Sequence, residues 1–458
     1  MSNDELYQQC IDVLVDNDRG SHTIPAPGLY PHQWLWDSCF IAIGQRHYDV
    51  ARAQQELLSL LRGQWHNGMI PNMILSRDFV GKQSASFWQS DLSPQSPDDY
   101  ATSGITQPPM LAEAVVRVGE MLSKNERQLW YKKMFPGLLA FHKWLYSERD
   151  FDGSGLISLV HPWESGLDNT PPWMSEIHAH GMPLWIKLVR LTKSDTILTH
   201  LRSDRKLALP GERLSTIDGL LLYSLQRKLR RHHYKITNKK NPTGIAFADI
   251  SFNSIFIRAN GLLREIAKTL NRPLPEKLLS KMQNTENSLE QLWDPYTGQY
   301  YSKDTISNQL IKISTIGSVL SLYSGVISKE RAKELVKLLG SKHLFNTDYP
   351  VPSVPVNSSW FKEKTYWQGP TWINTNWLII DGLRRYGYQA EANNLQSKTI
   401  DLVAKSGINE YFSPINGDSA GAKNFSWTAS LTIDLLARDM TPLAIKPKSK
   451  PPQGITHS

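Results

Sequence analysis

Residues 30–44 read YPHQWLWDSCFIAIG, and this stretch carries the pattern that decides the fold. Aromatic and polar residues come first, as far as Asp37 and Ser38, and an apolar run that suits a buried helix follows from Phe40. The same order, a polar aromatic turn at the end of a helix, recurs at several later points in the chain. A wall of helices, with loops at one rim that build a site, produces such an order. The stretch therefore favours a closed ring of helices.

Most segments with clear periodicity are helical, with apolar residues at the spacing of one helix face. Strand patterns bounded by hairpin turns are scarce. The expected helices cover residues 52–61, 110–121, 127–146, 253–270, 275–292, 316–322, 329–339, 371–386, 390–406 and 425–436. About a dozen helices are more than a simple bundle needs. We therefore expect an all-α protein built as a toroid.

The expected organisation is one catalytic domain over residues 1–440, interrupted by two long excursions at about 76–106 and 193–242. Both excursions are longer than ordinary connections, so each is either a lid over a cleft or a loop. The remaining residues, 441–458, are rich in Lys and Pro, and we expect them to be disordered.

The composition suits a globular enzyme and argues against several other classes. The 458 residues are 21% charged and 40% hydrophobic, which argues against a disordered chain. With Cys10 and Cys39 as the only cysteines, neither a zinc site nor a disulfide framework is indicated. The first residues have no basic and apolar leader, and no apolar run is long enough to cross a bilayer. We expect a cytoplasmic protein without membrane association.

The net charge is +8, and residues 227–235 form a visibly basic stretch. Clustered Lys and Arg can bind nucleic acid, but no nucleic-acid motif accompanies this run. A solvated helix face is therefore favoured, and a further alternative is that one cation meets an anionic part of a substrate. We expect no nucleic-acid partner, and the oligomeric state stays open.

Two short segments far apart in the chain, 161–169 (HPWESGLDN) and 409–414 (NEYFSP), place carboxylates among aromatic and small polar residues. Cleavage of a glycosidic bond uses such a pair, because one acid protonates the leaving oxygen and a second carboxylate activates water or attacks carbon. Glu164 and Asp168 compete for the first role. Asp168 follows a Gly-Leu break and can project into solvent, whereas Glu164 suits a bond to backbone amides at the turn. The second segment contributes Glu410.

Other polar and aromatic residues fall near helix ends. The chain has 15 Trp, an excess that suggests an aromatic cleft able to stack on sugar rings. Asp37 suits the cap of the helix that follows it and also suits an acceptor of hydrogen bonds from sugar hydroxyls, and the two roles do not exclude each other. Gln107 stands at a helix N-terminus, residues 366–374 (YWQGPTWIN) surround the start of another helix, and Trp427 returns at the last helix.

No cofactor or metal is expected. Residues 150–155 resemble the start of a calcium loop, but its twelfth position is His161, where a bidentate Glu is needed. Neither a Ser-His-Asp order nor a phosphate-binding glycine loop nor a dinucleotide fingerprint is apparent.

The five motifs at 36–40, 107–109, 161–169, 366–370 and 410–412 together resemble glycoside hydrolase family 63, and most closely its compact bacterial mannosylglycerate and glucosylglycerate hydrolases. The similarity covers roughly residues 27–436, in the same order. One position departs from the pattern, because many members of the wider family have Arg where this chain has Gln368.

The resemblance implies an (α/α)6 barrel with inserted segments that cap the site, and an inverting mechanism. Asp168 would be the general acid and Glu410 the general base, with carboxyl groups roughly 6.5–9.5 Å apart. The substrate-binding residues implied by the motifs are Tyr30, Trp34, Trp36, Asp37, Gln107, Trp163, Tyr366, Trp367, Gln368, Gly369, Trp372 and Trp427.

Our main hypothesis is an inverting exo-α-glycosidase for a small α-glucoside or α-mannoside, with glucosylglycerate and mannosylglycerate as candidate substrates. One alternative is an α-glucosidase or trehalase-like hydrolase for neutral oligosaccharides. Another, from a different class, is a sugar epimerase on a helical toroid, which would need histidine bases facing the sugar. A catalytically inactive carbohydrate-binding protein is a third alternative.

Overall fold

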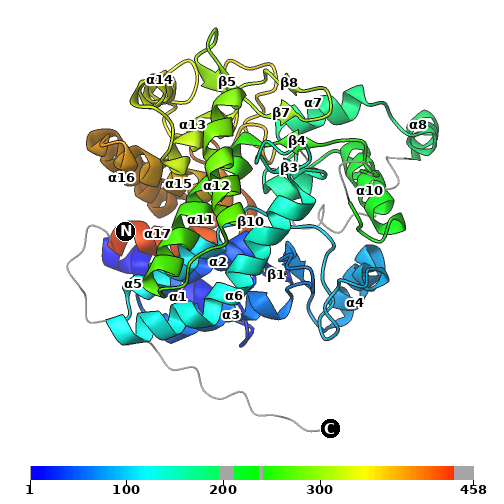
Figure 1. The fold of residues 1–458 in the computed structure, drawn as a ribbon. Coiled ribbons are helices and arrows are strands. Elements are labelled where there is room, and N and C mark those ends of the chain that lie inside the picture. The colour runs from blue at the N-terminus through cyan, green and yellow to red at the C-terminus, as the bar shows by residue number, and fades with distance from the viewer. Residues whose placement is uncertain (1, 195–210, 237–240, 438–458) are drawn as a thin grey trace.

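The computed structural model describes residues 2–194, 211–236 and 241–437. Helices dominate, and Figure 1 shows them arranged around a common centre. The expected tail at 441–458 and part of the second excursion lie outside the described residues. Along the described chain, no helix combines the length and the apolar character needed to cross a bilayer.

The barrel has an inner and an outer layer of helices. The inner layer comprises α2 (Leu35–Gln45), α5 (Leu111–Glu120), α11 (Ile250–Thr269), α13 (Ile316–Leu320) with η5 (Ser321–Ser324), α15 (Ile373–Arg385) and α17 (Ser426–Ala437). The outer layer comprises α1 (Asn3–Asp16), α3 (Val50–Arg62), α6 (Lys124–Glu148), α12 (Glu276–Ser288), α14 (Lys329–Gly340) and α16 (Gln389–Ser406). Each inner helix packs on its two inner neighbours, and α17 packs on α2, so the ring closes. Each outer helix packs on the inner helix before it in the chain, and α1 packs on α17. This is the expected (α/α)6 barrel.

Burial separates the two layers. Every residue of α2 is buried, and so is α17 from Ser426 to Leu436, because these helices are mostly apolar or small, with Asp37 and Asp434 as their only charged residues. In contrast, α14 buries only Ala332 and Leu335 and presents charged residues on its other faces. The composition of each helix therefore decides its layer.

The seam between α2 and α17 depends on a small residue. A β-carbon on Gly44 would lie 2.2 Å from Ser430 Oγ, so only glycine permits this approach. Ser430 Oγ accepts a hydrogen bond from the Gly44 amide at 3.0 Å and donates to the Phe40 carbonyl at 2.7 Å. The seam joins the N-terminal and C-terminal parts of the ring.

Buried charges close the end of the barrel at which the inner helices finish. Asp434 is fully buried and accepts hydrogen bonds from Arg46 Nη2 at 3.0 Å, His47 Nε2 at 2.9 Å and Trp377 Nε1 at 2.8 Å. Arg117 joins Glu113 and the α15 residue Asp381, at 2.8 Å each. These bonds tie four inner helices, α2, α5, α15 and α17, together at one end.

Two connections at the opposite end are long. The segment between α3 and α5 contains β2 (Met73–Ile74), α4 (Phe79–Trp88) and η1 (Ser90–Leu92). The segment between α6 and α11 contains β3 (Ser158–Leu159), η2 (Pro162–Ser165), α7 (Pro171–Ala179), α8 (Leu184–Leu191), α10 (Thr216–Arg231) and β4 (Phe247–Ala248). Both segments project from the same side of the barrel (Figure 1). They are joined there, because Gln226 Nε2 and Arg230 Nη1 of α10 donate to the Phe87 carbonyl of α4 at 3.1 and 3.0 Å.

The remaining strands are short. They are β1 (Gln33–Trp34), β5 (Trp293–Asp294), β6 (Gln299–Tyr300), β7 (Lys303–Asp304), β8 (Gln309–Leu310), β9 (Asn409–Phe412) and β10 (Ser419–Lys423), with η4 (Leu289–Leu292) after α12. β3, β4, β7 and β8 form one sheet in that order, and the other strands form the pairs β1–β2, β5–β6 and β9–β10.

The helices expected from periodicity are confirmed to within a few residues at their ends. The reading of Asp37 as the cap of α2 is wrong, because the helix begins at Leu35 and Trp34 occupies the capping position without a side-chain bond. Asp37 lies in the first turn instead.

Candidate active site

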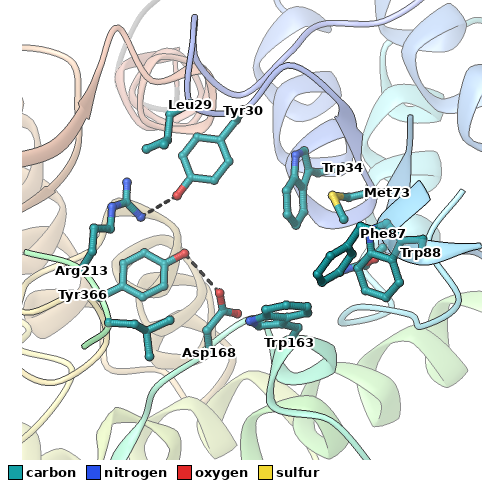
Figure 2. A pocket seen from close by; sticks show the side chains of 12 residues that line it. Leu29, Tyr30, Trp34, Met73, Phe87, Trp88, Trp163, Asp168, Arg213 and Tyr366 are labelled. Carbon is teal, nitrogen blue, oxygen red and sulfur yellow. Dashed lines mark hydrogen bonds between the residues drawn. The ribbon is translucent and has the colours of Figure 1, made fainter. Parts of the chain in front are cut away.

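A cavity of about 270 Å³ lies where the inner helices begin. It is lined by Leu29, Tyr30, Trp34, Asn72, Met73, Phe87, Trp88, Trp163, Asp168, Arg213, Leu214 and Tyr366. Figure 2 shows aromatic rings on one side of this space and Asp168, Arg213 and the two tyrosines on the other. The volume is slightly below the range of about 300–1,000 Å³ typical of ligand pockets, so the cavity suits a small ligand.

Asp168 reaches the cavity from the loop between η2 and α7. Gly166 makes the turn with a φ of 72°, and a β-carbon there would lie 2.7 Å from the Trp36 ring. The neighbouring Asn169 is fixed, because its Oδ1 accepts from the Trp367 amide at 2.9 Å and its carbonyl accepts from Gln368 Nε2 at 3.0 Å. These bonds orient the segment that carries Asp168.

Burial raises the pKa of Asp168 to about 7. The nearby Glu410 carboxylate raises the pKa further, whereas the Tyr366 hydrogen bond and the Arg213 cation lower it. Tyr366 Oη lies 3.4 Å from Asp168 Oδ2. A carboxyl group that keeps its proton near neutral pH can act as a general acid.

Glu164, the competing carboxyl, has a different environment. It is fully buried, pairs with Arg149 Nη2 at 2.9 Å, and accepts from the Val160 amide at 2.9 Å. The expectation that Glu164 binds a backbone amide at the turn is confirmed by this bond. Its two oxygens are thereby engaged away from the cavity.

Glu410 lies on β9, and its carboxylate is held by three partners. Oε2 accepts from the Ala422 amide of β10 at 2.8 Å and from Arg213 Nη2 at 2.5 Å. Oε1 accepts from Tyr30 Oη at 2.6 Å. Gly421 provides the space for this arrangement, because a β-carbon there would lie 2.4 Å from Oε2.

Arg213 was not anticipated from the sequence. Its guanidinium donates to Tyr30 Oη at 2.7 Å as well as to Glu410, and it lies 4.9 Å from the centre of the Tyr366 ring. The basic stretch at 227–235 does not supply the cation, because none of its residues lines the cavity. Arg213 stands upstream in a segment without periodicity, so no local pattern marks it.

Tyr366 has a strained backbone at the cavity wall. Its φ is 35°, which a bulky residue adopts only when its surroundings enforce it. The Tyr366 amide donates to the Glu212 carbonyl at 3.2 Å, and its own carbonyl accepts from Trp372 Nε1 at 3.1 Å. The position of the phenol ring is therefore set by bonds on both sides of the residue.

The predicted substrate-binding residues divide into two groups. Tyr30, Trp34, Trp163 and Tyr366 line the cavity. The others lie beneath its wall and are almost completely buried: Trp36, Asp37, Gln107, Trp367, Gln368, Gly369, Trp372 and Trp427. Their roles in binding substrate stay predictions.

Contacts within the buried group explain how it supports the wall. The rings of Trp367 and Trp372 stack with centres 3.8 Å apart, and Trp427 meets Trp36 edge to face at 5.5 Å. Gln107 Oε1 lies 3.5 Å from the Trp36 amide at the start of α2. Burial holds the pKa of Asp37 well above its usual range, and the charges of Glu410 and Asp168 add to this effect.

Neither a metal site nor a histidine site is evident among the described residues. No group of three or more potential ligands there could hold a metal ion. In the loop that resembles a calcium site, Asp150 instead pairs with Lys281 at 3.0 Å and accepts from the Gly155 amide. No histidine belongs to the described residues that line the cavity, and His161 is buried against the Leu222 carbonyl. An epimerase with histidine bases at the ring therefore finds no support here.

Comparison with known proteins identifies the class. The family model described as "Mannosylglycerate hydrolase MGH1-like glycoside hydrolase domain" matches residues 30–428. A mannosylglycerate hydrolase of Thermus thermophilus is 36% identical, over 93% of this chain and 99% of its own. A glucosylglycerate hydrolase of Mycolicibacterium hassiacum is 30% identical, over 94% of this chain and 98% of its own.

A solved structure agrees with these relatives. The crystal structure of a family 63 mannosylglycerate hydrolase from Thermus thermophilus, in complex with Tris and D-glycerate, superposes with a TM-score of 0.82. It is 34% identical and covers 94% of this chain and 99% of its own. The barrel and the cavity thus belong to a glycoside hydrolase. The chain is a member of the MGH1-like mannosylglycerate hydrolase family within glycoside hydrolase family 63.

Proposed function

We propose that this enzyme hydrolyses an α-glycoside of glycerate with inversion at the anomeric carbon. Asp168 is the general acid and Glu410 the general base. The observation that carries the choice of substrate is the Arg213 guanidinium, which stands in an aromatic cavity beside both carboxyl groups. The named relatives that act on mannosylglycerate and glucosylglycerate support the same substrate class.

The acid role of Asp168 follows from its protonation. Burial keeps its proton in place at pH values below about 7, and its carboxyl group lines the cavity. It would protonate the glycosidic oxygen as the bond to the anomeric carbon breaks, so that glycerate leaves as a neutral alcohol at that oxygen.

The base role of Glu410 follows from its charge. Arg213 Nη2 and the Ala422 amide bind one of its oxygens, and a carboxylate can accept a proton from water. The water would attack the anomeric carbon from the face opposite the leaving oxygen. The two carboxyl groups act on opposite faces of the sugar, and inversion is the consequence.

An anionic aglycone suits Arg213 better than a neutral one. A guanidinium forms two parallel hydrogen bonds with a carboxylate, which fixes the ligand as well as attracting it. In the free enzyme the Nη1 and Nη2 atoms of Arg213 donate to Glu410. The Nε–H of Arg213 is buried and has no hydrogen-bond partner, so it remains to donate to a glycerate carboxylate while Glu410 keeps its bonds.

The inserted segments are assigned as caps in this proposal. Phe87 and Trp88 of the first segment and Arg213 and Leu214 of the second line the cavity. We also assign the enzyme to the cytoplasm, because Cys10 and Cys39 are buried free thiols, as a reducing compartment favours.

Substrates with and without a carboxylate on the aglycone test the proposal. Hydrolysis of glucosylglycerate and mannosylglycerate is compared with that of glucosylglycerol, which has a hydroxymethyl group in place of the carboxylate, and with trehalose. We expect kcat/KM for at least one glycerate to exceed that for glucosylglycerol by about 10- to 100-fold, the worth of one charge-assisted bond. In Arg213→Ala this ratio should fall toward one. Trehalose or glucosylglycerol as the best substrate would refute the assignment of a glycerate aglycone.

A further inference from the structure

Two phenol groups lie between the proposed acid and the proposed base. Tyr366 Oη is 3.4 Å from Asp168 Oδ2, and Tyr30 Oη is 2.6 Å from Glu410 Oε1. The two phenol rings flank the Arg213 guanidinium, whose carbon lies 5.6 Å from the centre of the Tyr30 ring and 4.9 Å from that of Tyr366, and Tyr366 lowers the pKa of Tyr30. In Figure 2 the two hydroxyls point into the same space between the rings. The order of groups is therefore Asp168, Tyr366, Tyr30, Glu410.

Inverting hydrolysis leaves these groups with their protons misplaced. Asp168 gives its proton to the leaving oxygen, and Glu410 receives one from the attacking water. The enzyme is ready for another substrate only after Asp168 has regained a proton and Glu410 has lost one.

We propose that Tyr30 and Tyr366 form a relay that returns the proton from Glu410 to Asp168 after each turnover. The Glu410 O–H bond breaks as the proton binds Tyr30 Oη. The original Tyr30 proton passes to Tyr366 Oη, and the original Tyr366 proton passes to Asp168. Both phenols end the step neutral, the base is again a carboxylate and the acid is again protonated, so charge and atoms balance. This inference rests on the proposed function, since a retaining enzyme would have no such proton to return.

The surroundings favour a coupled transfer over ionisation of a phenol. Burial holds the pKa of Tyr30 and of Tyr366 well above the usual range, so neither phenolate forms as a stable intermediate. Each phenol gains one proton while it gives up another.

Arg213 supports the direction of the transfer. Its guanidinium contacts Glu410 and donates to Tyr30 Oη, so its charge disfavours the extra proton on the base side. Asp168 lies at the other end of the chain of groups, where burial favours the protonated acid.

The contacts of Tyr366 with Asp168 and with Tyr30 must both shorten, because the two phenol hydroxyls form no hydrogen bond with each other in the free enzyme. The contact with Asp168 is already close. At 3.4 Å it is longer than the roughly 2.5–3.0 Å of an established O–H···O bond. Catalytic hydrogen bonds in free enzymes are often long and tighten in the complex. The bonds of the Tyr366 backbone to Glu212 and Trp372 hold this residue beside Asp168 in the meantime.

A comparison of first-turnover and steady-state rates tests the relay. Tyr30→Phe and Tyr366→Phe keep the rings and remove the hydroxyls. Hexose release is followed by rapid quench near pH 6, below the Asp168 pKa of about 7, with the glycerate substrate that the unmodified enzyme hydrolyses. Each variant should release one hexose per active site in a first phase. Its steady-state rate should then be at least about 10-fold slower, which is less than the usual worth of a positioned proton-transfer group because water also delivers protons.

Tyr411→Phe is the matched control. Tyr411 is also a buried tyrosine near the cavity, but its hydroxyl donates to the Glu212 carbonyl at 2.8 Å and lies outside the relay. In Tyr411→Phe the first-turnover rate and the steady-state rate should change by the same factor, and hexose release should show no separate first phase.

A small proton donor separates the relay from slow product release. Added imidazole should raise the steady-state rate of Tyr30→Phe and Tyr366→Phe in proportion to its concentration. The relay is refuted if the first-turnover and steady-state rates fall equally in both variants, or if imidazole has no effect on the slow phase. Failure of the proposed function would instead be seen in the unmodified enzyme, as no hexose in its first turnover with either glycerate glycoside.

Discussion

Replacement of Gly421 by alanine should inactivate the enzyme with a modest loss of stability. A β-carbon at this position would lie 2.4 Å from Glu410 Oε2, whereas ordinary contacts begin near 3.4 Å, so the carboxylate must move by about 1 Å. A misplacement of about 1 Å can cost about 100-fold in rate. Gly421 also has a φ of 73°, which costs an alanine roughly 1–2 kcal/mol of folding free energy. We therefore expect kcat to fall about 100-fold in Gly421→Ala, with a small decrease in Tm.

Gly298→Ala is the matched control for backbone strain. Gly298 has a φ of 66° in the turn between β5 and β6, and nothing lies within 4 Å of a β-carbon built there. This variant should leave kcat unchanged and lower Tm by less than Gly421→Ala does, because a β-carbon at Gly421 would also lie 2.5 Å from the Tyr411 ring. Steady-state kinetics and thermal unfolding of both variants supply the comparison. Gly421→Ala with full activity, or an equal loss of activity in both variants, would show that Gly421 does not hold the base in place.

The remaining predictions concern the acid and the closed end of the barrel. Because Asp168 must be protonated and its pKa is about 7, kcat/KM should fall as the pH rises through about 7. In Tyr366→Phe this fall in kcat/KM should occur at higher pH, because the Tyr366 hydrogen bond lowers the pKa of Asp168. A fall at the same or a lower pH would contradict this cause. Asp434→Ala should lower the free energy of unfolding by about 3–5 kcal/mol, because it removes the buried carboxylate that accepts from Arg46 Nη2, His47 Nε2 and Trp377 Nε1. Asp418→Asn, at an exposed ion pair with Lys364, should cost less than about 1 kcal/mol in the same urea titration, and equal losses would refute the difference in burial as the cause.

The barrel was predictable because its signals are local. Apolar spacing marks a helix within the helix itself, and helices that are apolar on all sides, such as α2, belong to an inner layer. The first helix was missed although a local signal exists, because Ser2 and Glu5 form a capping box at its start. The second excursion has a weaker pattern, and its helices α7 and α8 were not expected.

The sequence could suggest cavity residues where the signal sits within one segment. The Gly166-Leu167 break in the turn at 161–169 favoured Asp168 over Glu164, and of these two only Asp168 lines the cavity. The strand that carries Glu410 was not expected, because β9 depends on pairing with β10, whose Ser419–Lys423 segment has no strand-favouring residues. Arg213 depends on contacts with residues about 200 positions away, such as Glu410, so its role becomes apparent only in the folded chain.

Inversion requires that Asp168 and Glu410 act on opposite faces of the α-glycoside. Proton NMR of the hexose first released, recorded before mutarotation, tests it most directly. We expect the β-anomer from an α-glucoside or α-mannoside of glycerate. Initial release of the α-anomer would contradict it, since Glu410 would then act as a nucleophile and not as a base for water.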